Sequence, residues 1–141
     1  MSVYADSSLF VSLYLRDAHF GEALRRIGEG HWIWFTPLHR VEWEHAVAQH
    51  LFRQVMSPDQ AESVYLAFES DREQGLWVQA EMPAATFETA IEVARKHVAH
   101  VGGRTLDTLH VASALELGAE RFWTFDDRQA KLASAVGLKV R

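Results

Sequence analysis

Val3-Tyr4-Ala5-Asp6 is a short run of strand-forming residues that ends on a carboxylate, and a stretch typical of a helix follows it. Phe122-Trp123-Thr124-Phe125-Asp126 repeats this pattern near the other end of the chain. In an open parallel sheet, such strand-to-helix junctions lie outside the carboxyl ends of the strands, where ligands bind. We therefore expect Asp6 and Asp126 to meet at one edge of a sheet.

Strands and helices alternate along the rest of the chain. Further strands are predicted at 31–35 and 138–140, and the run 76–80 is extended in character without showing whether it joins the sheet. Helices are predicted at 8–15, 18–27, 36–53, 57–74, 83–100, 105–117 and 127–135. This alternation predicts one three-layer α/β/α domain over residues 1–141 with a mainly parallel central sheet.

Composition limits the functional classes. The chain has 141 residues, of which 48% are apolar, and its formal net charge is -5. This charge excludes a global attraction to nucleic acid or anionic membranes, so a polyanion would have to be held locally. The absence of cysteine excludes disulfides, thiolate metal sites and cysteine nucleophiles. No apolar run approaches the length of a membrane span, and we expect a soluble, cytoplasmic protein.

Two further acids accompany Asp6 and Asp126. Asp107 enters a helix that is otherwise nearly all apolar, and Glu42 lies in the helix after Thr36-Pro37. Clustered carboxylates repel one another unless a hard divalent cation compensates their charge. The four acids therefore predict a site for Mg²⁺ or Mn²⁺.

Each acid also has a purely structural interpretation. Asp6 and Asp126 stand where a carboxylate caps a helix, although Asp127 could cap the second helix instead. If Thr105 is an N-cap, Asp107 only occupies the first turn of its helix. Glu42 has Glu44 close by on the same helix, and at most one of them can enter a common site.

Other motifs are absent or weak. The sequence contains no Gly-x-Ser-x-Gly, Walker or GxGxxG pattern, so a hydrolase triad, a phosphate loop and a dinucleotide fold have no support. We interpret the eight histidines as non-ligands, and His110 as a packed or hydrogen-bonded helix residue. Basic residues gather at Arg95, Lys96 and Arg104, which leaves room for a patch facing phosphate or for an ordinary solvated helix face.

Four motifs in order resemble those of the PIN-domain family, and within it the VapC-type toxins of bacterial toxin–antitoxin pairs. They are Val3-Tyr4-Ala5-Asp6-Ser7-Ser8-Leu9, Arg40-Val41-Glu42-Trp43-Glu44-His45-Ala46-Val47, Arg104-Thr105-Leu106-Asp107-Thr108-Leu109-His110-Val111-Ala112-Ser113-Ala114 and Thr124-Phe125-Asp126. The resemblance spans the chain, although the region from about 54 to 100 matches only in being helical. It favours Glu42 over Glu44, because Ala46-Val47 stand at the family's spacing from Glu42.

The resemblance implies a metal-dependent endoribonuclease. Its catalytic and metal-binding acids would be Asp6, Glu42, Asp107 and Asp126, with Mg²⁺ or Mn²⁺ as cofactor. Ser7 and Thr124 match hydroxyl positions that hydrogen-bond around such a site, and Asp127 would be an outer acid. Flanking phosphates of the RNA would be held by Arg95, Lys96 or Arg104. The implied partners are a VapB-like antitoxin and a second copy of the chain in a homodimer, with no membrane.

Two other functions fit the same residues. A metal-dependent phosphoesterase acting on small molecules would use the same acids, and a deep closed pocket would favour it over an open groove for RNA. A non-enzymatic partner-binding module would use the carboxylates only as caps. Its interface would come from the exposed share of an aromatic set comprising Trp32, Trp34, Trp43, Phe52 and Trp77.

Overall fold

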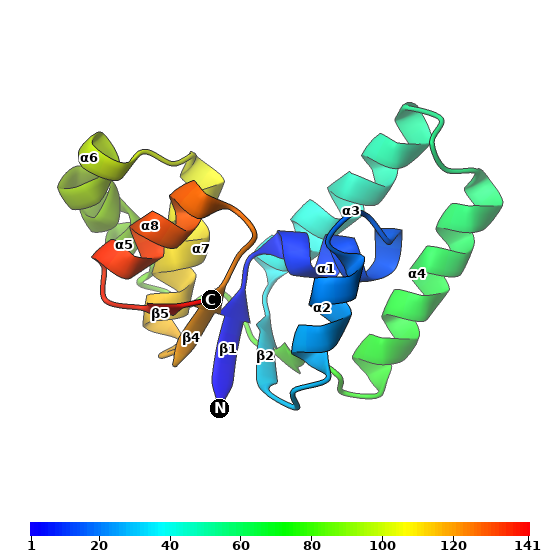
Figure 1. Cartoon of the computed structure of the whole chain (residues 1–141), viewed down its shortest axis with the longest axis horizontal. Helices are drawn as coiled ribbons and strands as arrows, with labels where there is room; N and C mark the ends of the chain where they lie inside the picture. The colour runs from blue at the N-terminus through cyan, green and yellow to red at the C-terminus, as the bar shows by residue number, and fades with distance from the viewer.

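Five parallel strands form the centre of this computed structural model, which describes residues 1–141 (Figure 1). The strands are β1 (Ser2–Ala5), β2 (Trp32–Phe35), β3 (Val78–Gln79), β4 (Arg121–Trp123) and β5 (Lys139–Val140). Their order in the sheet is β3-β2-β1-β4-β5. The first strand is therefore central, and Ala5 at its carboxyl end pairs with Trp123 of β4. This pairing places Asp6 beside Thr124, as expected from the two strand-to-acid junctions.

The helices connect these parallel strands. They are α1 (Ser7–Leu15), α2 (Phe20–Ile27), α3 (Pro37–Phe52), α4 (Pro58–Glu73), α5 (Thr86–Val93), α6 (Ala99–Val101), α7 (Thr105–Glu116) and α8 (Asp127–Ala135), with a π-helical turn η1 (Ala94–Val98) between α5 and α6. In Figure 1 the blue-to-green helices α1 to α4 lie on one side of the strands, and α5 to α8 lie on the other. None of the helices combines the length and apolar character needed to cross a bilayer.

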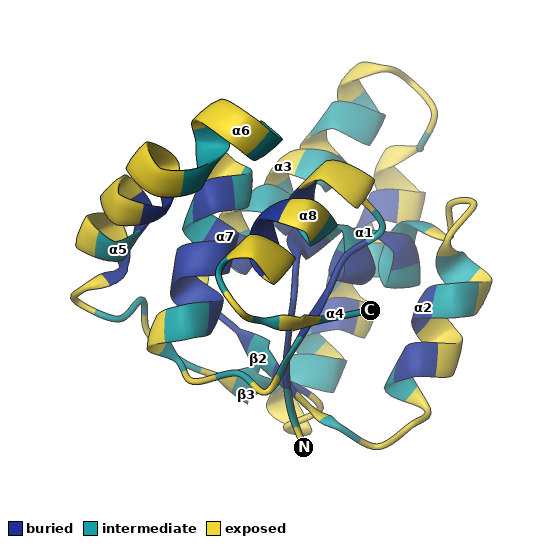
Figure 2. Ribbon diagram, turned by 60° about the vertical axis from the view of Figure 1, so that its left-hand side comes forward, coloured by how far each residue is buried: buried dark blue, intermediate teal, exposed yellow.

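Two hydrophobic cores, one on each face of the sheet, hold the layers together. Side chains alternate along a strand, so Val3 and Ala5 face α1 and α3 while Tyr4 faces α7 and α8. Trp123 and Phe122 divide between the two cores in the same way. Figure 2 shows the buried, dark blue stripe of α7 against the sheet and the exposed outer faces of α5 and α6. The predicted three-layer α/β/α fold with a parallel central sheet is confirmed.

The structure changes several predicted boundaries. The extended run 76–80 does join the sheet, as the edge strand β3. The predicted strand through Phe125 ends at Trp123, because the chain turns there to begin α8. The helix expected from Pro83 begins only at Thr86, whose N–H donates to the Pro83 carbonyl in a preceding turn (3.0 Å). The same predicted helix also contains η1, a π-helical turn that sequence periodicity does not reveal.

Candidate active site

Asp6 lies at the end of β1 and is almost completely buried (8% exposed). Its Oδ1 accepts hydrogen bonds from the backbone N–H of Ser8 (3.0 Å) and from the Ser8 hydroxyl, and its Oδ2 accepts one from Thr124 Oγ1 (3.1 Å). The capping interpretation is therefore correct for Asp6. Burial raises the pKa of Asp6, although these hydrogen bonds and the His110 charge oppose that effect. The ionised carboxylate thus lacks full compensation within the protein.

Glu42, on the first half of α3, is held by side chains from two other elements. Its Oε1 accepts a hydrogen bond from Ser7 Oγ (2.8 Å) and contacts His110 Nε2, which donates to it. On the other side of the imidazole, the Tyr4 hydroxyl lies 2.8 Å from His110 Nδ1. Burial opposes ionisation of Glu42, but the hydrogen bonds and charge of His110 outweigh it and leave its pKa below the ordinary value. Glu42 is therefore a fixed anion.

The Tyr4–His110 pair supports Glu42 from the side of the sheet. Tyr4 is completely buried, and burial raises its pKa, so the phenol stays protonated beside His110 Nδ1. The other ring nitrogen of His110 donates to Glu42. A buried tyrosine of the central strand and a buried histidine of α7 thus fix the position of a carboxylate on α3.

Asp107 stands at the third position of α7. Its Oδ2 accepts hydrogen bonds from the Arg104 backbone N–H (3.0 Å) and from Arg104 Nε (3.3 Å). Arg104 is the N-cap residue of α7, so the alternative that Thr105 caps this helix is wrong. The physical reason is local: extended backbone at Arg104 lets the Asp107 carboxylate reach back to its N–H, as in a capping box.

Asp126 is the N-cap of α8. Its Oδ1 accepts hydrogen bonds from the backbone N–H groups of Arg128 (2.8 Å) and Gln129 (3.0 Å). Asp127, the alternative cap, is instead the first residue of the helix and is exposed. Thr124 Oγ1 links this junction to β1, because it accepts from the Asp126 N–H (3.0 Å) and donates to Asp6.

The four acids lie around one edge of the sheet, with Arg104 among them. Its guanidinium pKa is raised, first by the hydrogen bond to Asp107 and that carboxylate's charge, then by the charges of Asp126 and Glu42. A cleft of about 710 Å³ contains Asp107, Asp126 and Asp127, and a neighbouring hollow of about 340 Å³ contains Glu42 and Asp107. Arg104 lines both. The positive charge of one exposed arginine therefore interacts with three carboxylates, which come from three helices.

The donors are of the kind that binds a hard divalent cation. Glu42 Oε2, Asp107 Oδ1 and Asp126 Oδ2 make no hydrogen bond within the protein, whereas the second oxygen of each is engaged. Carboxylate oxygens are the preferred ligands of Mg²⁺ and Mn²⁺. In this arrangement of the side chains, however, no group of three or more histidine or acidic side chains is placed so that it could hold an ion. Arg104 supplies the positive charge there.

Some residues around the site were not singled out from the sequence. His110 is buried and hydrogen-bonded, as interpreted, but its contact with Glu42 was not anticipated. A signal existed, since His110 follows Asp107 by three positions and so shares its helix face. Arg128 and Lys131 line the larger cleft, whereas Arg95 and Lys96, expected near the phosphates, lie exposed on η1 and line neither cleft.

His39 supplies a pH-dependent contribution to stability beneath the site. Its Nε2 donates to the Ala5 carbonyl (2.7 Å), and its Nδ1 accepts from the Thr36 N–H (2.9 Å). Complete burial, followed by the His110 charge, lowers the pKa of His39 well below its ordinary value. Below about pH 6.5, His39 therefore binds a proton in the unfolded chain but stays neutral in the native protein. The native state loses stability as the pH falls through this range.

We expect His39→Gln to reduce the pH dependence of unfolding between pH 7 and pH 5 by about 2 kcal/mol, measured by urea denaturation. The matched control, His45→Gln, replaces an exposed histidine of the same helix and should keep the wild-type dependence. An identical pH profile for wild type and His39→Gln would contradict the assignment of a neutral buried imidazole.

Comparison with known proteins places the chain in a family. The model of the PIN domain matches residues 3–135. The fold is similar to the crystal structure of VapBC2 from Rickettsia felis bound to a DNA fragment from their promoter. That match has a TM-score of 0.68 and 14% identity, and it covers 100% of this chain and 98% of the other. The fold is also similar to VapC20 of Mycobacterium tuberculosis, a toxin that cleaves the sarcin-ricin loop. There the TM-score is 0.66 and the identity 18%, with coverage of 96% and 95%.

No curated protein matches the chain. At these identities the two solved structures establish the shared fold alone. The family model is the stronger finding, since it spans nearly the whole chain and includes all four acids. The chain belongs to the PIN domain family.

Proposed function

We propose that this PIN-domain protein is an endoribonuclease dependent on Mg²⁺ or Mn²⁺, and the toxin of a type II toxin–antitoxin pair. The observation that carries the proposal is the arrangement of Glu42, Asp107 and Asp126 around Arg104 at the carboxyl edge of the sheet. Asp6 lies beneath them, buried and linked to the Asp126 junction through Thr124. Membership in the PIN family and the structural likeness to VapC toxins support the same function.

In this proposal Asp6, Glu42, Asp107 and Asp126 would hold the metal. When bound, Mg²⁺ or Mn²⁺ supplies an activated water and stabilises charge on the phosphate. Ser7 and His110 hold Glu42 through Oε1 and leave Oε2 without a hydrogen bond, and Glu42 lines the smaller hollow. Thr124 and Ser8 hold Asp6. The side chains thus orient the carboxylates, and no protein nucleophile takes part.

The shape of the site favours a polymer over a small molecule. Arg104 is 80% exposed, and the cleft that it shares with Asp107 and Asp126 is open to solvent. An open cleft accepts a chain that enters and leaves at its two ends, whereas phosphoesterases of small molecules enclose their substrates. RNA is therefore the proposed substrate, recognised by shape and by unpaired bases.

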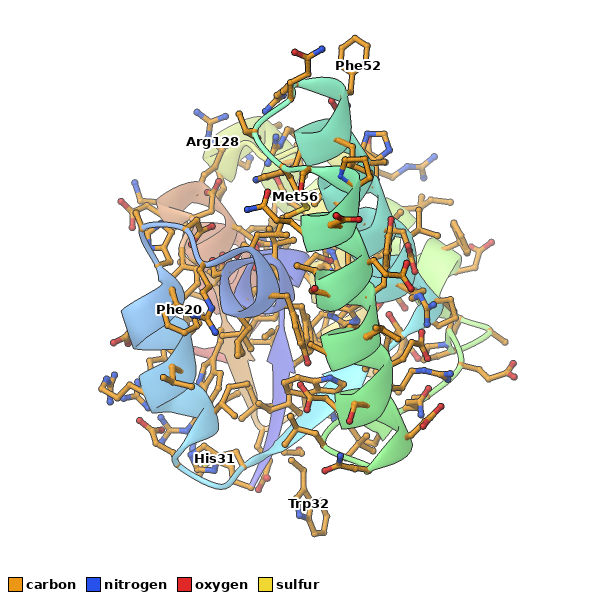
Figure 3. All side chains as sticks on the ribbon, turned by 90° about the vertical axis from the view of Figure 1, so that its right-hand side faces the viewer. Phe20, His31, Trp32, Phe52, Met56 and Arg128 are labelled. Carbon is orange, nitrogen blue, oxygen red and sulfur yellow. The ribbon has the colours of Figure 1, made fainter.

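The proposed partners follow from the same assignment. A VapB-like antitoxin would block the acids, and exposed aromatic residues offer apolar surface for it or for a second copy of the chain. Trp32 and Phe52 are 69% and 85% exposed, and Figure 3 shows both side chains projecting from the surface. Trp43 and Trp77 are buried in the core and can contribute nothing to an interface.

The chemistry of the cut ends tests the function. Attack by water on phosphorus, with the 3′ oxygen leaving, yields one fragment with a 5′-phosphate and one with a 3′-hydroxyl. We expect purified protein to produce these ends from transfer RNA or ribosomal RNA with Mg²⁺ or Mn²⁺, and to produce none in EDTA. Ends carrying a 2′,3′-cyclic phosphate, or cleavage that continues in EDTA, would refute the metal-dependent mechanism.

A further inference from the structure

We propose that Arg128 and Lys131, together with Arg104, form a phosphate-binding subsite that holds the RNA backbone on the α8 side of the acids. This inference rests on the proposed function and adds to it the path of the substrate. It also moves the expected backbone contacts from Arg95 and Lys96 on η1 to Arg128 and Lys131 on α8.

The first observation is where the basic side chains lie. The larger cleft, of about 710 Å³, is lined by eight residues: Val101, Arg104, Asp107, Phe125, Asp126, Asp127, Arg128 and Lys131. Its three cations come from the residue before α7 and from the first and second turns of α8. A phosphodiester in this cleft would therefore meet positive charge directly beside the carboxylates Asp107 and Asp126.

The second observation is that Arg128 and Lys131 form no salt bridge, although three carboxylates line the same cleft. Five other arginines of the chain, Arg25, Arg26, Arg40, Arg72 and Arg141, each bond to a glutamate, whereas Arg16, Arg53, Arg95 and Arg121 form no salt bridge. Arg128 and Lys131 are both exposed and keep their charge unshared. They do not serve to neutralise the acids, and their charge is available to an anionic ligand.

The third observation is that the backbone positions Arg128. Gly102 has a φ of +83°, and a Cβ placed there would lie 3.2 Å from the Arg128 Cδ. The aliphatic part of Arg128 therefore crosses the Cα of Gly102, which has no side chain. Gly102 precedes Arg104 by two positions in the chain. Figure 3 shows Arg128 at the end of the molecule where the α6 and α8 ribbons lie. Glycine at this position both adopts the turn and makes room for the side chain.

The region of Arg95 and Lys96 offers a matched comparison. Both residues lie on η1, are exposed and form no salt bridge, so they resemble Arg128 and Lys131 in charge and solvation. Neither lines a cleft that contains a site acid. Replacing either pair removes the same charge from the protein, and only one pair should affect bound phosphates.

The experiment measures RNA binding as a function of salt. The double variants Arg128→Ala/Lys131→Ala and Arg95→Ala/Lys96→Ala are compared with wild type, using a fluorescent uridine oligonucleotide in EDTA so that no cleavage occurs. Each phosphate contact to a single strand contributes about 0.7 to the slope of log Kd against log salt. We expect the slope to fall by about 1.4 for the Arg128/Lys131 pair and to stay at the wild-type value for the Arg95/Lys96 pair.

Two outcomes would overturn the subsite: equal changes of slope in both variants, or a change only in the Arg95/Lys96 pair. Arg128→Gln/Lys131→Gln keeps part of each aliphatic stem, including the one that crosses Gly102, and replaces the alanine pair if that pair lowers the melting temperature. The test is separate from that of the nuclease. If the wild-type protein cleaves RNA but the Arg128/Lys131 variant keeps the wild-type slope, the subsite is refuted and the nuclease function is not. If the slope falls as expected but the wild-type protein never cleaves RNA, the subsite is supported and the nuclease function is refuted.

Discussion

Replacing Glu42 by glutamine is expected to lower metal-dependent RNA cleavage at least about a hundredfold, since loss of even an outer partner of a metal site costs 10–100-fold. The structure makes this substitution specific. Glu42 Oε1 accepts the hydrogen bonds from Ser7 and His110, and a glutamine carbonyl can accept the same two. The oxygen that makes no hydrogen bond becomes an amide nitrogen, which cannot bind a cation. The fold is kept while one ligand is lost.

The matched control for this prediction is Glu44→Gln. Glu44 lies two positions further along α3 and forms a salt bridge with Arg40 (2.8 Å), away from the acids. Removing an exposed ion pair costs at most about 1 kcal/mol of stability, so Glu44→Gln should keep most of the activity. Initial rates of cleavage in Mg²⁺ measure both effects. Loss of activity in Glu44→Gln but not in Glu42→Gln would show that the other face of α3 carries the site.

Millimolar Mg²⁺ or Mn²⁺ is expected to raise the melting temperature of the protein. A cation that binds only the native state stabilises it by about 2.7 kcal/mol when its concentration is 100 times Kd, which corresponds to a rise of roughly 8 °C for a domain of this size. The physical source of the effect is the buried carboxylate of Asp6, whose pKa burial raises, together with the other acids at the same edge of the sheet. Differential scanning fluorimetry with increasing metal measures the rise.

Asp6→Asn should reduce that rise without destabilising the metal-free protein. The asparagine carbonyl can accept the Ser8 N–H, and its amide can donate to Thr124 Oγ1. The Thr124 hydroxyl then donates to Gln129 Oε1, which lies 2.7 Å away, in place of Asp6. The control Glu92→Gln replaces an exposed acid of α5, outside both clefts, and should keep the full rise. A wild-type melting temperature that does not change with metal concentration would contradict the proposed site.

Local signals in the sequence predicted the elements that bear the site. Thr36-Pro37 and Ser57-Pro58 begin α3 and α4 as expected, because a capping side chain and a proline act on the backbone next to them. The strand-to-acid junctions at Asp6 and Asp126 were found for the same reason, and both carboxylates do cap helices. Sheet geometry then placed the two junctions on one edge, as Thr124 confirms by bonding to Asp6.

The sequence by itself determined the fold, the edge of the sheet that bears the acids and the four acids expected there. Only the tertiary structure decided how those acids are held and what lies beside them. Tyr4 meets His110 across 106 positions, and Arg128 crosses Gly102 from a separate helix. Periodicity and capping act over a few residues, whereas such contacts depend on how helices pack on the sheet. The sequence therefore did not predict the hydrogen bonds that orient Glu42 or the basic residues that line the larger cleft, because both depend on how the layers pack.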